Sequence, residues 1–294
     1  MGEQLKEADI DAAWSDADEP QAQVQSLTRP ETEIIVDDEI TDIAVVPPTV
    51  LGELARSEIE TQISAARQHP RSIGQFKKDL LNMVTLDEDT AAGCFYHLKR
   101  GGKTIEGPTI RFAECAYLAW GNVRSATRSI DIGEEFVTAQ AFVVDVQRNV
   151  AHAEEHKRRI LDKNGSRYNT DMIQVTMAAA QKIALRNAIL AVIPRMFMRQ
   201  ALDAARKISV RGADGKKPLG VRRREIVDQL IKRGVSEKRV LATLGRAGID
   251  DMTWEDLETL IGLGTAVKDG LTTLEEAFGA TGSDRDRLAK AAES

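Results

Sequence analysis

The spacing of apolar residues changes twice along the chain. Over residues 51–70 apolar side chains recur at helical intervals, and a second helix is predicted over residues 73–84. Between residues 94 and 147 the period becomes that of β-strands. Helical spacing returns at residue 172 and continues in short segments to residue 278. This succession predicts an α+β fold.

The strand-forming segment begins with a predicted hairpin. Residues 94–99 and 103–105 form its strands, and Gly101-Gly102 forms its turn, because paired glycines accept the positive φ that such turns need. A helix is predicted over residues 109–120 and ends at Gly121. Strands over residues 123–132 and 136–147 follow. Both sets of alternate residues in the second of these are apolar, which predicts a central strand covered on both faces.

A long helix is predicted to close this part of the chain. Residues 150–161 fit either a strand or a helix, and the Asn164-Gly165 hairpin signal after them favours a strand. Over residues 172–193, small side chains at every third or fourth position allow a neighbouring element to approach closely. These are Ala180, Ala184, Ala188 and Ala191. We therefore expect an antiparallel sheet, made of the hairpin and a three-stranded meander, packed on this helix.

Composition divides the chain into five parts. Residues 1–50 are acidic and rich in polar residues and proline, which predicts a disordered tail. Residues 51–211 form the main domain, residues 212–220 a Gly/Lys/Pro linker, residues 221–280 a small helical domain, and residues 281–294 a second tail. There is no secretory pattern at the N-terminus, no apolar run long enough for a membrane span, and no metal-site cysteine spacing. We expect a cytoplasmic protein with two reduced cysteines.

The distribution of charge points to a polyanionic partner. Residues 99–224 contain 24 Lys and Arg against 12 Asp and Glu, within a chain whose formal net charge is -6. The first 50 residues hold 13 acidic and 2 basic residues. A basic middle between acidic ends is typical of nucleic-acid binding, because neutralising phosphates releases counterions.

The basic residues gather on the two predicted hairpins, on one strand face and along one edge of the long helix. If the sheet stacks on that helix, they line one groove that follows a nucleic-acid backbone. Tyr96 and Tyr168 fit either base stacking or core packing. The predicted DNA-binding residues are Lys99, Arg100, Lys103, Arg124, Arg128, Lys157, Arg158, Arg159, Lys163, Arg167, Tyr168, Lys182 and Arg186.

Two other functions are compatible with parts of the sequence. The string from His152 to His156, with Glu155 between them, fits the HxxEH pattern of a zinc-dependent hydrolase. That pattern needs a helix, because on a strand the two histidines stand about 13 Å apart. A duplex-binding transcriptional regulator is the other alternative. The C-terminal helices of this chain are acidic on balance, which argues against their entering a DNA groove. No Walker A motif occurs, so we expect neither ATP use, nor a cofactor, nor a catalytic site.

Four segments carry a family resemblance by their order. They are residues 103–107 (KTIEG), 111–122 (RFAECAYLAWGN), 136–144 (FVTAQAFVV) and 179–188 (AAQKIALRNA). This order resembles the annealing core of the Rad-fifty-two recombination mediators and their bacteriophage relatives. Residues 240–245, 252–257 and 268–278 look like the small helical domain that ends RecT and Red-beta type recombinases.

The resemblance implies an ATP-independent phage recombination protein that binds single-stranded DNA and anneals complementary strands. It further implies a homo-oligomeric ring or helical filament. For residues 221–280 it implies binding to the host single-stranded-DNA-binding protein and to a phage exonuclease.

Overall fold

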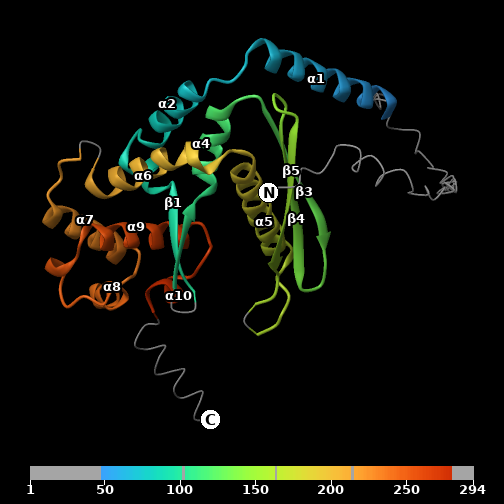
Figure 1. Ribbon diagram of the computed structural model, residues 1–294. Coiled ribbons are helices and arrows are strands. Elements are labelled where there is room, and N and C mark those ends of the chain that lie inside the picture. The colour runs from blue at the N-terminus through green and yellow to red at the C-terminus, as the bar shows by residue number, and fades with distance from the viewer. Residues whose placement is uncertain (1–47, 101–102, 163, 213–214, 280–294) are drawn as a thin grey trace, which may run out of the picture. The chain divides into compact units, whose positions relative to one another are not determined.

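A computed structural model describes residues 48–100, 103–162, 164–212 and 215–279 (Figure 1). The chain divides into two compact units, residues 1–51 and 52–294. Most of the predicted acidic tail, the C-terminal tail, the Gly101-Gly102 turn and Lys163 lie outside the described residues. The second unit contains the contacts that build the fold.

The secondary structure is α+β, as predicted (Figure 1). In chain order the elements are α1 (Pro48–Gln68), α2 (Ile73–Val84), α3 (Glu88–Ala92), β1 (Phe95–Arg100), β2 (Lys103–Pro108), α4 (Ile110–Trp120), β3 (Val123–Ile132), β4 (Phe136–Asp145), β5 (Val150–Arg159), α5 (Thr170–Val192), α6 (Arg195–Arg211), α7 (Leu219–Lys232), α8 (Glu237–Leu244), the 3-10 turn η3 (Ile249–Asp251), α9 (Trp254–Lys268) and α10 (Leu274–Phe278).

The described strands form two separate antiparallel sheets, so the hairpin and the meander do not join in the single sheet that was predicted. β1 and β2 pair as the predicted hairpin, and β3, β4 and β5 pair in that order as the predicted meander. The long helix α5 packs against β4 and β5. Its alanines at 180, 184 and 188 are fully buried, so the predicted ridge of small side chains is confirmed there. Ala191, the fourth predicted member, is exposed.

One face of the three-stranded sheet is open except near Arg124, whose guanidinium donates to the Gln62 side chain of α1 at 3.2 Å. Val137, Ala139 and Ala141 of β4 are fully buried on the face that meets α5. On the other face the rings of Phe136 and Phe142 are 45% and 44% exposed. The prediction that this strand is covered on both faces is therefore wrong.

Several boundaries differ from the sequence-based prediction. Residues 150–159 form a strand, which resolves the ambiguity in that segment. Strand β2 continues to Pro108, and the predicted linker ends earlier because Leu219 and Gly220 begin α7. Helix α3 was not predicted, since it has only five residues; the Asp87 side chain caps it by accepting from the Thr90 amide.

A buried ion pair ties the end of β4 to the segment before α2. The Arg71 and Asp145 side chains are each 3% exposed and lie 2.8 Å apart. Arg71 also donates to the carbonyls of Trp120 and Gly121, and its guanidinium lies 4.1 Å from the centre of the Trp120 ring. Trp120 in turn packs edge-on against Phe76 within the main apolar core.

The C-terminal helices have an apolar core of their own and also contact the hairpin. Leu230, Leu257 and Phe278 belong to that second core. Helix α9 packs against β1, and the Thr265 hydroxyl donates to the Ala92 carbonyl. Arg111 of α4 makes two hydrogen bonds to Asp269. These helices thus share one compact unit with the sheets.

Within the described residues, α5 alone has the length and apolar composition of a membrane-spanning helix. Its ridge of alanines is nonetheless buried against protein. Both cysteines are free thiols, and burial raises the pKa of Cys94 to about 12. A thiol with that pKa stays protonated at neutral pH, which fits the predicted role in the core.

Candidate nucleic-acid interface

A basic cleft runs along α5. Its larger hollow, of about 600 Å³, lies between the base of the β1–β2 hairpin, α5 and α6. Its smaller hollow, of about 270 Å³, lies between the start of α4, α5, β5 and the segment after α9, which contributes Asp269 and Leu271. Arg186 lines both hollows, and we call the two together the cleft.

Three of the predicted basic residues meet in this cleft. Arg158 comes from β5, whereas Lys182 and Arg186 lie one turn apart on α5. The Arg186 guanidinium is 5.5 Å from the centre of the Tyr96 ring and donates twice to the side-chain oxygen of Asn187. Lys182 forms an ion pair with Glu114 at 2.8 Å. The predicted grouping of β5 with the helix edge is therefore present in the fold.

Two further arginines line the cleft and were missed from the sequence. Arg195 and Arg199 lie at the start of α6, are both exposed, and line the larger hollow. In the part of the chain that the structure describes, neither makes a hydrogen bond or an ion pair. Their spacing of four residues, directly after Pro194, is the signal in the sequence that could have found them.

Four other predicted residues lie on the open face of the three-stranded sheet. Arg124 and Arg128 share this face of β3, as predicted, because they pair with Val144 and Gln140 of β4. The same face of β5 carries Lys157 and Arg159. Because α5 covers the opposite face, these four residues do not line the cleft, and the prediction of one groove for all the basic residues is wrong.

The hairpin tip carries a third, smaller basic group. Arg100 pairs directly with Lys103, whereas the Lys99 ammonium donates to the Thr243 carbonyl of α8 at 2.7 Å. Burial lowers the pKa of Lys99. Lys99 thus joins the hairpin to the C-terminal helices.

The remaining predicted residues lie near the turn after β5. Arg167 is exposed and forms an isolated bridge with Leu161. Tyr168 packs on the small apolar cluster of Val137, Ala139 and Met177. Of the two interpretations left open for the tyrosines, Tyr168 thus has a packing role, and Tyr96 lines the cleft.

The geometry of β5 argues against the zinc-hydrolase alternative. His152 and His156 lie on an extended strand and pair with Val143 and Ala139 of β4, so the helical arrangement that HxxEH needs is not formed. His152 lies 3.2 Å from Glu154 on the same strand. Burial, followed by the nearby Arg158 and Arg186, lowers the pKa of His156.

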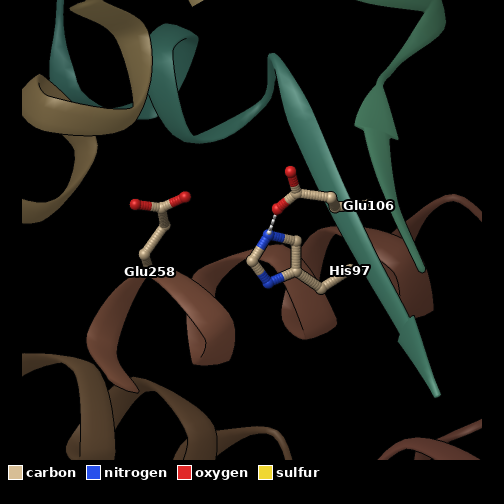
Figure 2. Close-up of side chains that lie close together, drawn as sticks. All are labelled: His97, Glu106 and Glu258. Atoms are coloured by element: carbon tan, nitrogen blue, oxygen red, sulfur yellow. Dashed lines mark ion pairs between the residues drawn. The ribbon is translucent and has the colours of Figure 1, made fainter. Parts of the chain in front are cut away.

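A different histidine lies in a cluster with two glutamates. His97 of β1, Glu106 of β2 and Glu258 of α9 place their ligand atoms within 4.8 Å of one another (Figure 2). Arg206 of α6 already contacts both carboxylates, at 3.4 Å from Glu106 and 3.6 Å from Glu258. Because this guanidinium compensates the carboxylates, the arrangement favours an ion-pair network over a metal site.

His97 is the most buried member of this cluster. Its side chain is 6% exposed, and its Nε2 atom lies 3.3 Å from a Glu106 oxygen in an orientation that does not make a hydrogen bond. Burial lowers the pKa of His97, outweighing the opposing effect of Glu106. Burial also raises the pKa of Glu258, against the effect of Arg206.

No protein-family model, curated protein or solved structure matches the chain. The resemblance to annealing proteins therefore stays a prediction from its motifs, and the functional argument depends on the geometry of the basic surfaces.

Proposed function

We propose that this protein binds single-stranded DNA in the cleft and anneals complementary strands without ATP. The observation that carries the proposal is the gathering of five basic side chains from three elements along one hollowed surface. They are Arg158, Lys182, Arg186, Arg195 and Arg199. Three of them, Lys182, Arg195 and Arg199, are exposed. Cations gathered in a cleft attract a phosphate backbone irrespective of base sequence.

The chemistry of the cleft suits a single strand. Arg195 and Arg199 are free to contact phosphates without breaking a bond inside the described chain. Tyr96 presents an aromatic ring beside the half-buried Arg186, a combination on which a base can stack. The reaction itself is base pairing. The protein supplies alignment and charge neutralisation, and the proposal needs neither a catalytic residue nor a cofactor.

The wider setting of the proposal follows the resemblance. Several copies in a ring or helical filament would join their clefts into one track for DNA. Residues 221–280 would bind the host single-stranded-DNA-binding protein and a phage exonuclease, in the cytoplasm of the host cell. The order of the four motifs supports this setting.

The test is annealing of complementary oligonucleotides by the full chain, without nucleotide or added metal. Wild type should accelerate annealing, and the variant Arg195→Glu/Arg199→Glu should bind single-stranded DNA at least about tenfold more weakly. If both arginines contact phosphates, the plot of log K against log salt should become less steep by about 1.4 in the variant, because each phosphate contact contributes about 0.7 to the slope. Both positions are exposed, and glutamate at position 195 is also favourable in the first turn of α6, so the variant is compatible with folding.

The matched control is Lys232→Glu/Lys238→Glu, which changes the net charge equally on exposed residues outside the cleft. It should bind DNA as wild type does. Lys182→Glu is a less direct test, because it also places two carboxylates together at Glu114. Failure of wild type to accelerate annealing, or equal losses in both double variants, would contradict the proposal.

A further inference from the structure

The open face of the three-stranded sheet presents aromatic rings to solvent. Phe142 lies in the central strand directly between Ala126 of β3 and Ala153 of β5. Both directly paired neighbours are small, and Phe142 is 44% exposed. Phe136, on the same face, pairs with Arg159. The two rings are six residues apart on one strand, which corresponds to about 20 Å.

A polar row crosses the sheet between these rings. Arg128 donates to the Gln140 side chain at 2.8 Å, and Gln140 donates to Glu155 at 3.0 Å. The row joins all three strands and leaves the rings on either side of it uncovered. Thr138, beside the row, pairs with Lys157. Along β4 this face carries Phe136, Thr138, Gln140 and Phe142 in that order, so two polar side chains lie between the two rings.

The charge of this face is positive. Arg124, Arg128, Lys157 and Arg159 stand against Asp131 and Glu155. Lys157 and Arg159 are exposed and make no hydrogen bond or ion pair to other described residues. A second copy seated face to face would bring these cations against their own equivalents, which is unfavourable. A negatively charged partner with flat apolar rings is complementary to the face.

Single-stranded nucleic acid has that chemistry. Aromatic side chains on an exposed sheet stack bases in sequence-tolerant fashion, while flanking cations contact phosphates. This face and the cleft lie on opposite sides of the sheet, since α5 covers one side and lines the cleft. One molecule therefore has two separate surfaces suited to a single strand.

We propose that the open sheet face is a second single-strand site, which stacks bases on Phe136 and Phe142 and holds phosphates with Lys157 and Arg159. The inference rests on the proposed annealing function and deepens it. With one strand in the cleft and another on the sheet face, a molecule or its neighbour presents two strands at once.

The test distinguishes stacking on a flat aromatic ring from contact with an apolar side chain of similar size. In Phe136→Leu/Phe142→Leu the bulk is kept and the flat rings are lost; in Phe136→Tyr/Phe142→Tyr the rings are kept. Each full-length protein is first mixed with one molar equivalent of an unlabelled oligonucleotide, enough to fill one of the two sites, and binding of a labelled, non-complementary oligonucleotide is then measured. We expect the leucine variant to bind the second oligonucleotide at least about tenfold more weakly, and the tyrosine variant to bind it within about twofold of wild type.

Photocrosslinking locates the contact independently. An oligonucleotide with 5-iodouracil should crosslink within residues 136–145 in wild type once the cleft is occupied. Leu86→Ala, a truncation of a side chain that is 76% exposed elsewhere, controls for surface apolar change. Its binding of the second oligonucleotide should equal that of wild type.

Three outcomes would overturn the inference. Equal second-strand binding by wild type and the leucine variant would do so while leaving annealing in the cleft intact. Loss of self-association in the leucine variant, with its binding of the second oligonucleotide unchanged, would assign the face to a second copy. If wild type binds no single-stranded DNA at all, the proposed function fails together with the inference.

Discussion

The two sheets of this protein differ in how they are covered. The hairpin of β1 and β2 is held by α9, and its buried face includes a histidine within a network of charged side chains. The three-stranded sheet is covered by α5 through a ridge of alanines, and its other face is open. The contact between the hairpin and α9 depends on polar side chains and on the close approach of the α9 backbone to His97 at Gly262. The contact of the three-stranded sheet with α5 depends on small apolar side chains, which leave the basic residues outside it free to face solvent.

Arg71→Ala should break the anchor of the three-stranded sheet and give the largest loss of stability. It removes the partner of Asp145 and leaves a carboxylate in a site that is 3% exposed. Breaking a buried pair from one side costs about 3–5 kcal/mol. Urea unfolding of the variant measures this loss. Arg67→Ala, at an exposed position in α1, should change stability by less than about 0.5 kcal/mol. A loss below about 1 kcal/mol for Arg71→Ala would show that the pair does not anchor the sheet.

Gly262→Ala should separate the hairpin from α9 with a smaller loss. A Cβ atom at Gly262 would lie 2.8 Å from Cγ and 2.9 Å from the backbone nitrogen of His97, so backbone must move. Overpacking of this kind costs about 1–3 kcal/mol. At Gly264, two residues further along α9, a Cβ atom would lie 3.4 Å from the flexible end of Arg233 and 3.9 Å from a Leu230 methyl group, so Gly264→Ala should fit and gain helix propensity. Denaturant midpoints should therefore move in opposite directions; a stabilised Gly262→Ala would rule out the close contact.

As the pH falls, the contact between the hairpin and α9 should weaken before other parts of the fold. The expected loss of stability is smaller than that of either substitution above. The pKa of His97 is lowered by burial in the folded state, so the unfolded chain takes up a proton near pH 6.5 and the folded chain only at lower pH. The stability that depends on neutral His97 is complete above about pH 6.5 and decreases as the pH falls through the folded pKa. Unfolding free energies at pH 7.5 and 5.5 should differ more for wild type than for His97→Gln. Equal differences would show that another group controls the effect.

The ion pair of Arg71 and Asp145, which anchors the three-stranded sheet, should weaken at a lower pH than the contact at His97. Burial acts to raise the pKa of Asp145, but hydrogen bonds from Arg71 and Trp120 outweigh it and lower the pKa overall. The contribution of the ionised carboxylate is therefore present above about pH 4 and is lost as the pH falls further. Near-ultraviolet circular dichroism of the tryptophans during acid titration checks this order. Loss of the Trp120 signal before the change that depends on His97 would contradict it.

Local patterns were enough to predict most of the strands and helices. Alternation and the glycine at 121 located β3 and β4, and the small residues spaced three or four apart in α5 located the contact with the sheet. Alternation does not say which faces are covered, because both sets of residues in β4 are apolar. The phenylalanines at 136 and 142 were therefore assigned to a buried face that is in fact open.

The candidate site was predicted only in part, for a related reason. Lys182 and Arg186 lie one turn apart on a helix, and this local spacing brought them into the predicted set. Whether Lys99 faces DNA or a carbonyl of α8 depends on a contact 144 residues away in the chain. The two arginines at the start of α6 enter the cleft because the chain turns at Pro194, and the angle of that turn is a tertiary property.

The order of elements also has a consequence for how the chain folds. β3, β4, β5 and α5 are consecutive, so this half can form through contacts between neighbouring segments, which favours rapid folding. The hairpin instead needs α9, which comes much later in the chain. The hydrogen bond from Thr265 of α9 to Ala92, just before β1, joins residues that are 173 positions apart. During synthesis the half that carries the open sheet face can therefore be complete while the ribosome is still adding the residues that will cover β1.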